Sequence, residues 1–162
     1  MEEPRPTPLH QGLGAFFRYL GGPRNVRAFF DSSSFAKRLL DENGSDEVEA
    51  ACAEATELGL SVLCVPEIVS ALNRRRRERS LTRGQYDSMK RHLIDDVRDA
   101  DIVNLTASVV GSSISVLEAS PVRALDALHV ACALEWGADL FVSSDKRQLG
   151  AAMKAGLNTK MV

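Results

Sequence analysis

The chain has 162 residues, of which 44% are hydrophobic and 26% are charged. This size and balance fit one globular domain and leave no room for a second full domain. With 20 basic and 22 acidic residues the formal net charge is -2, so no overall basic field attracts nucleic acid. No apolar run approaches the ~18 residues of a membrane span, and the first residues lack the basic flank of a secretory signal. We therefore expect a soluble, cytoplasmic protein that binds any polyanion through a local patch.

Side chains that bind zinc or iron are scarce. Cys52, Cys64 and Cys132 are far apart in the sequence and stand among apolar residues, where a free thiol acts as a small core side chain. The histidines do not pair with them at a spacing typical of zinc sites. We expect neither disulfides nor a zinc or iron site, so a bound metal would need oxygen ligands.

Residues 1–26 are expected to form an N-terminal extension that is partly disordered. Residues 1–10 hold three of the six prolines and have no apolar periodicity. Residues 12–22 have the composition for one or two helical turns, which their glycines weaken. The folded domain is therefore predicted to span residues 27–162.

Strands and helices are predicted to alternate from residue 27 onward. Short apolar runs predict strands over residues 27–30, 60–65, 101–105, 140–143 and 157–162. Capping residues, glycines and prolines predict helices over residues 32–44, 45–58, 66–79 and 121–136. They also predict one helix that begins at residue 82, one that ends at residue 120 and one that ends at residue 156. Such alternation indicates an α/β fold with a central parallel sheet and helices on both faces, in which ligands bind at the carboxyl ends of the strands.

Four acidic residues are candidates for a site at this edge, although each also has a structural explanation. Asp31 and Asp145 follow predicted strands and are suited to cap the next helix. Glu67 lies in a first helical turn, where a negative charge offsets the helix dipole. Asp126 stands on a mostly apolar helix, where a buried acid needs a partner.

Considered together, the four acids suggest a metal site. Two like charges ~4 Å apart cost about 4 kcal/mol at an effective dielectric of 20, so gathered carboxylates favour a bound cation. All-oxygen ligands prefer Mg²⁺ or Mn²⁺ to zinc. The chemistry that this indicates is metal-assisted hydrolysis of a phosphodiester.

Four short motifs in register resemble those of PIN-domain ribonucleases, particularly VapC-type toxins of toxin-antitoxin systems. They are Phe-Asp-Ser-Ser at 30–33, Pro-Glu-Ile-Val-Ser-Ala-Leu at 66–72, Arg-Ala-Leu-Asp-Ala-Leu-His at 123–129 and Phe-Val-Ser-Ser-Asp at 141–145. The resemblance implies a PIN-like domain with endoribonuclease activity that depends on Mg²⁺ or Mn²⁺. It also implies a VapB-type antitoxin as partner and a homodimer.

Carried over by position, the resemblance assigns a role to five residues. It implies that four acids hold the metal or orient its water: Asp31, Glu67, Asp126 and Asp145. Ser143 occupies the small hydroxyl position of the family's Thr/Ser-x-Asp motif, where it would hydrogen-bond within the acidic cluster. His129 and Arg123 lie three residues to either side of Asp126. We expect a structural hydrogen bond from His129, and from Arg123 either a contact with a site carboxylate or a phosphate or a surface ion pair.

A local basic stretch supplies the patch that the net charge does not. Residues 74–91 contain eight basic side chains and two acidic ones. Five arginines lead this stretch as candidates for binding RNA or a protein partner: Arg74, Arg75, Arg76, Arg77 and Arg79. The alternative is a solvated helix end without a partner.

Three other functions fit the sequence less well. A haloacid-dehalogenase-like phosphatase needs a second acid two residues after the first, where this chain has Ser33. A receiver domain needs an acidic pair and a later lysine that are not found. A catalytically silent PIN-like module that binds RNA or protein is the more serious alternative, against which the four retained acids argue.

Overall fold

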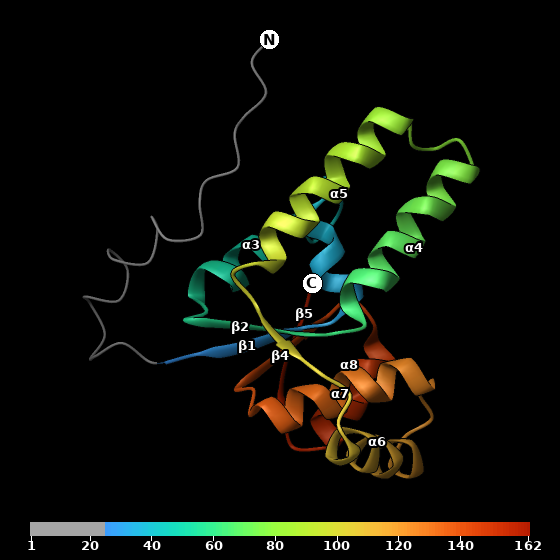
Figure 1. Ribbon diagram of the computed structural model, residues 1–162. Coiled ribbons are helices and arrows are strands. Elements are labelled where there is room, and N and C mark those ends of the chain that lie inside the picture. Colours follow the sequence, from blue (N-terminus) through green and yellow to red (C-terminus); the bar gives the residue numbers. More distant parts are fainter. Residues whose placement is uncertain (1–24) are drawn as a thin grey trace.

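The computed structural model describes residues 25–162, and the expectations for the preceding extension lie outside this range. Figure 1 shows a central sheet between two groups of helices. The strands are β1 (Arg27–Phe30), β2 (Glu57–Ser61), β3 (Asp101–Val103), β4 (Leu140–Ser143) and β5 (Asn158–Met161). The helices are α2 (Ser32–Phe35), the short 3₁₀ helix η1 (Ala36–Arg38), α3 (Ser45–Glu54), α4 (Cys64–Arg77), α5 (Arg83–Val97), α6 (Ala107–Ala119), α7 (Ala124–Trp136) and α8 (Lys146–Lys154).

The sheet is parallel throughout, with the strand order β3-β2-β1-β4-β5. β1 lies at its centre, and Phe30 at its end is in register with Leu60 of β2 and Val142 of β4. The residues that directly follow these strands therefore meet at one edge. The predicted α/β fold is confirmed.

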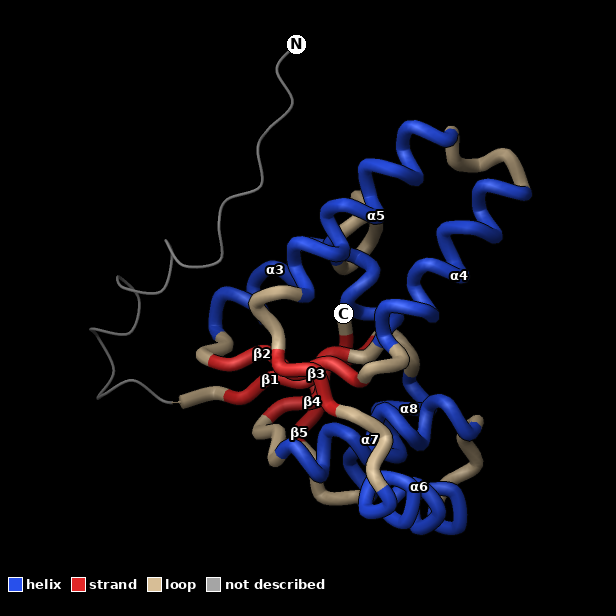
Figure 2. The backbone as a smooth tube through the Cα atoms, viewed as in Figure 1, coloured by secondary structure: helices blue, strands red, loops and turns tan. Residues whose placement is uncertain are grey.

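Helices cover both faces of the sheet, and each face has its own core (Figure 2). Phe30 points into the core formed with α2, α3, α4 and α5, whereas Phe29 points into the core formed with α6, α7 and α8. Both phenylalanines are fully buried. Burial on both sides explains why residues 28–30 of β1 are all apolar, without polar alternation.

Some predicted boundaries were wrong. The helix expected over 32–44 is shorter, because the hydroxyl of Ser45 donates to the carbonyl groups of Lys37 and Leu40 and closes a turn there. β2 begins and ends earlier than predicted and contains Gly59, which had been interpreted as a helix stop. A Cβ atom at Gly59 would lie 2.7 Å from the Trp136 ring, so packing requires this glycine within the strand.

Two prolines do not begin helices as predicted. Pro66 is the third residue of α4, where its missing N–H costs nothing because the first-turn N–H groups have no partner within a helix. Pro121 precedes α7, which begins only at Ala124. The later start changes the position of Asp126, which lies in the first turn of α7.

α4 and α5 form a hairpin that projects from the body of the domain (Figure 1). Thr82 caps α5 through the predicted capping box with Gln85. The ring of Tyr86 packs between the cationic groups of Arg76 and Lys90, at 5.3 and 5.7 Å from its centre. We call the arginine-rich tip of this hairpin, residues 74–79, the basic tip. Within the described part of the chain, no helix is long and apolar enough to cross a membrane.

Candidate active site

Asp31 is the first residue after the central strand, and it is held by donors on both carboxylate oxygens. Its exposed fraction is 3%. Oδ1 accepts the N–H of Ser34 at 2.8 Å and thereby caps α2, as one explanation of this residue predicted. Ser33 donates to Oδ2 at 2.7 Å, and Ser143 donates to the same oxygen at 2.8 Å. Hydroxyl groups from two segments thus fix the orientation of this carboxylate.

Ser143 links Asp31 to the next part of the site. It is fully buried at the end of β4, and its Oγ accepts the N–H of Asp145 at 3.0 Å. The buried side chain of Gln148 lies 3.2 Å from the same Oγ and donates from Nε2 to the backbone oxygen of Asp126 at 3.2 Å. Gln148 therefore connects β4 with the start of α7.

Glu67 is half-buried in the first turn of α4, and two side chains converge on one of its oxygens. Ser32 Oγ donates to Oε2 at 2.5 Å, and His129 Nε2 lies 2.6 Å from the same atom. Burial by itself would raise the pKa of Glu67, but the hydrogen bonds from His129 and Ser32 outweigh it and hold the pKa below its usual value. Glu67 is therefore a carboxylate at neutral pH.

Asp126 and Asp145 cap helices at this edge. Asp126 is half-buried, and its Oδ2 accepts the N–H of Arg123 at 3.2 Å. The partner that a buried acid needs is thus a backbone group of its own helix end. Oδ1 of Asp145 accepts the N–H of Arg147 at 2.8 Å and caps α8, and the Arg147 side chain lies 3.9 Å away.

The structure joins some predicted site residues directly and leaves others apart. A hydrogen bond connects Asp31 with Ser143, and Gln148 bridges these to the main chain of Asp126 and to Asp145. Glu67 has no direct contact with the other three acids and is joined instead to Ser32, the neighbour of Asp31. We call these four carboxylates together the acidic edge.

The acidic edge has the donor chemistry for a hard divalent cation, but it is not assembled as a three-ligand site. Among residues 25–162, no three His, Cys, Asp or Glu side chains are grouped so that they could hold a metal ion. Three acids nevertheless keep one oxygen without a hydrogen-bond donor in this part of the chain: Glu67 Oε1, Asp126 Oδ1 and Asp145 Oδ2. Oxygen atoms of this kind are the ligands that Mg²⁺ and Mn²⁺ prefer.

The four carboxylates do not require a cation for their stability, contrary to the expectation from their number. Each of the four acids accepts hydrogen bonds from protein groups, and three of them cap helices. These donors stabilise the negative charges without a metal. The presence of the acids alone does not distinguish a nuclease from a silent module.

Several residues of the site were missed by the sequence analysis. Ser32 and Ser33 were predicted only as helix-start residues, whereas their hydroxyl groups donate to the carboxylates of Glu67 and Asp31. Gln148 carried no recognisable signal. His129 does form a hydrogen bond, but with Glu67 rather than with Asp126, three residues before it.

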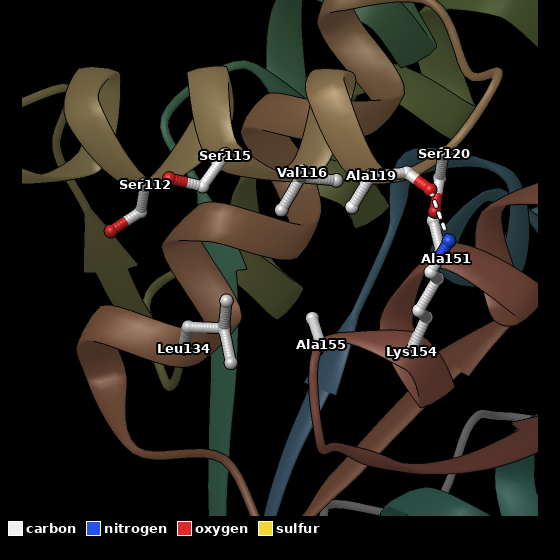
Figure 3. Close-up of a pocket in the computed structure, with 9 residues that line it drawn as sticks. All are labelled: Ser112, Ser115, Val116, Ala119, Ser120, Leu134, Ala151, Lys154 and Ala155. Carbon is white, nitrogen blue, oxygen red and sulfur yellow. Dashed lines mark hydrogen bonds between the residues drawn. The ribbon is translucent and has the colours of Figure 1, made fainter.

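Two of the surface hollows in the described part of the chain lie against helices that flank the sheet. One, of about 270 Å³, adjoins the acidic edge: it runs from Ser33 along η1 and α4 to Arg74 and Arg75, with mainly apolar walls between. The other, of about 260 Å³, lies between α6 and α8, where Lys154 donates to the carbonyl oxygen of Ala119 (Figure 3). The second hollow contains none of the predicted site residues.

These observations define a class of protein: a parallel α/β domain with carboxylates at the carboxyl edge of its sheet. The PIN domain family model matches residues 28–153. The match spans most of the chain, which therefore belongs to the PIN-domain family, as the motifs suggested.

Individual relatives agree with this assignment. Ribonuclease VapC45 of Mycobacterium tuberculosis (strain CDC 1551 / Oshkosh) is 32% identical over 109 residues, which cover 67% of this chain and 76% of that protein. The structure of VapC20 from Mycobacterium tuberculosis, a sarcin-ricin loop cleaving toxin, matches with a TM-score of 0.60 and 16% identity over 80% of this chain and 95% of that one. A toxin-antitoxin complex from Klebsiella pneumoniae matches with a TM-score of 0.57 and 12% identity over 75% of this chain and 89% of that one. At such identities the two structures show a shared fold.

Proposed function

We propose that this PIN-domain protein is a metal-dependent endoribonuclease and the toxin of a VapBC-type pair. The observation that carries the proposal is the position of Asp31: it follows the central strand, is buried, and is held by Ser33 and Ser143 within the acidic edge. Ligand sites of open parallel sheets lie at this edge. Similarity to VapC ribonucleases supplies the reaction class.

Asp31, Glu67, Asp126 and Asp145 are the residues that would hold Mg²⁺ or Mn²⁺. When bound, such an ion activates water and offsets the charge of a phosphate oxygen. The protein's own contribution is to orient the ligands: Ser33 and Ser143 fix the plane of the Asp31 carboxylate. Fixed ligands bind a cation with less loss of side-chain entropy.

The basic tip is proposed to bind the RNA backbone. Arg74, Arg76, Arg77 and Arg79 are exposed, and the structure gives none of them an ion pair with an acid of residues 25–162. Arg75 differs, because it pairs with Glu42 at 3.4 Å. Cations without acidic partners are available to phosphates.

The hollow beside the acidic edge favours a protein partner such as a VapB-type antitoxin. Its walls include Leu39, Leu40 and Ile68, which offer little to a nucleic acid backbone and suit apolar side chains. A peptide lying there would extend from Ser33, two residues after Asp31, to Arg74. The relative from Klebsiella pneumoniae is a toxin-antitoxin complex.

A homodimer is supported by the surface of α6. Val110, Ile114 and Leu117 are 45%, 52% and 39% exposed and lie on one side of the helix, and Glu118 is its one charged residue. Exposed apolar residues at this spacing mark an interaction surface. In a two-fold interface the same face meets itself, and an uncharged face does so without repulsion between like charges.

The enzyme and the silent binding module are separated by a cleavage assay. Total bacterial RNA is incubated with wild type, with Asp31→Asn and with Asp99→Asn, each with Mn²⁺ or with excess chelator, and the new RNA ends are sequenced. Asp99 is exposed at the end of α5, so its variant is a matched control. We expect defined cuts with wild type and Asp99→Asn, and their loss with Asp31→Asn or chelator. Equal cutting under all conditions, or none with wild type, would remove the enzyme proposal.

A further inference from the structure

We propose that Ser32 and His129 are positioning residues that hold the Glu67 carboxylate by Oε2 and leave Oε1 for a divalent cation. This inference rests on the proposed metal dependence of the site. It concerns two residues that the family resemblance did not assign to metal binding.

Three elements from distant parts of the chain meet at Glu67. Ser32 is on α2, Glu67 on α4 and His129 on α7. α4 packs on one face of the sheet and α7 on the other, so the contact between Glu67 and His129 passes over the ends of the strands. A solvated first-turn acid does not need such a partner, because water and the helix dipole already stabilise it.

Both donors bind the same oxygen. Ser32 Oγ and His129 Nε2 lie 2.5 and 2.6 Å from Oε2, and they lie 3.2 Å from each other. Oε1 has no hydrogen-bond donor among the described residues. The Oε2 atom is therefore held by two donors, and Oε1 has none. A carboxylate that binds a metal through one oxygen is oriented in the same way, by hydrogen bonds from neighbouring side chains to its other oxygen.

The hydrogen on the imidazole follows from its surroundings. Glu67 is an acceptor and its two short contacts need hydrogens, so His129 Nε2 carries one. His129 is 3% exposed, and its Nδ1 is buried without a partner. No other group of residues 25–162 forms a hydrogen bond with the ring nitrogens, so the polar contacts that orient the ring are those of Nε2 with Glu67 and Ser32.

The test measures Mn²⁺ affinity directly, without cleavage. Free Mn²⁺ is titrated against wild type, His129→Leu, His129→Gln, Ser32→Ala and the control His92→Leu, and the unbound ion is followed by electron paramagnetic resonance. The Gln amide nitrogen replaces Nε2, whereas Leu fills the volume without a donor. His92 is exposed on α5 and lies outside the acidic edge.

We expect His129→Leu to raise the Mn²⁺ Kd about 10- to 100-fold, which is typical of lost second-sphere support, and Ser32→Ala to raise it less. His129→Gln should recover most of the affinity, and His92→Leu should match wild type. An unfolding transition measured in excess chelator checks that each variant is folded. If His129→Leu does not fold, the outcome is decided by His129→Gln and by Ser32→Ala, which changes a half-buried residue. Wild-type affinity in folded Ser32→Ala and His129→Leu would overturn the positioning role alone. Absence of Mn²⁺ binding by wild type would overturn the metal proposal as well.

Discussion

Ser143 at the end of β4 donates a hydrogen bond of 2.8 Å to Oδ2 of Asp31, the residue that follows β1. Both side chains are buried, so this bond joins two neighbouring strand ends out of contact with solvent. Because the acceptor is a carboxylate, we expect Ser143→Ala to lower the free energy of unfolding by about 1.5–3 kcal/mol. Urea denaturation at pH 7 measures this change.

Ser113 provides the matched control for this substitution. It is also buried, but its hydroxyl donates to the carbonyl oxygen of Val110 within the same helix. Ser113→Ala should remain within about 0.5 kcal/mol of wild type, because the higher helix propensity of alanine offsets a weak bond. Equal losses in the two variants would contradict a special role for the bond to Asp31.

The free energy of unfolding should depend on pH through Glu67. Its pKa is lowered in the folded state, so the ionised form stabilises the fold, and this stabilisation is complete above the unfolded pKa of about 4.3. It is lost as the pH falls through the lowered folded value. We therefore expect Glu67→Gln to be destabilising at pH 7 and the difference from wild type to shrink as the pH falls below about 4.3 and through the lowered folded pKa, as measured by urea denaturation at each pH.

An exposed acid gives the comparison for this experiment. Glu54→Gln, at the end of α3, should show a small difference from wild type that does not follow the same trend. A Glu67→Gln difference that grows as the pH falls would mean that the carboxyl is stabilised in its protonated form.

The positions of Asp31 and Asp145 could be predicted because each follows a short apolar run that ends abruptly, and both runs are central strands. The contacts of Glu67 could not be predicted in this way. They depend on how α4 and α7 approach each other from opposite faces of the sheet, and periodicity along the chain contains no information about that approach.

Two further errors have local causes. Pro121 was interpreted as a helix start because proline is suited to the first position, yet the chain remains irregular until Ala124. Gly59 was interpreted as a helix stop, although its small size serves the contact with Trp136. At Gly59 the packing against Trp136 outweighs the local preference.

Gly59 provides a direct test of that contact. A methyl group added there would lie 2.7 Å from the Trp136 ring, so we expect Gly59→Ala to cost about 1–3 kcal/mol through overpacking. Trp136 is the single tryptophan, so its fluorescence should also change in the folded state. The control is Gly150→Ala in α8, where nothing lies within 4 Å and alanine should stabilise by roughly 0.5–1 kcal/mol. Equal stability of the two variants would contradict the packing explanation.

The proposed dimer surface is tested by a charge on α6. Ile114 is 52% exposed, and Ile114→Glu should convert a wild-type dimer into a monomer in multi-angle light scattering, because a buried, unpaired carboxylate opposes association. Ile94→Glu is the control, since Ile94 is 46% exposed on α5. A monomeric wild type, or a dimer that survives Ile114→Glu but not Ile94→Glu, would refute α6 as the interface.

The basic tip makes a prediction about salt. Arg77 and Arg79 are exposed and distant from the acidic edge along α4, so their removal should weaken RNA binding without altering the carboxylates. Each phosphate contact with a single strand contributes about 0.7 to the slope of log K against log salt. We expect Arg77→Gln with Arg79→Gln, in an Asp31→Asn background that prevents cleavage, to reduce the slope by about 1.4 in a binding titration at several KCl concentrations. Arg98→Gln, whose arginine pairs with Asp95 at the end of α5, should leave the slope unchanged. If the double variant also leaves it unchanged, the arginines are a solvated helix end, and the RNA must be held by other residues.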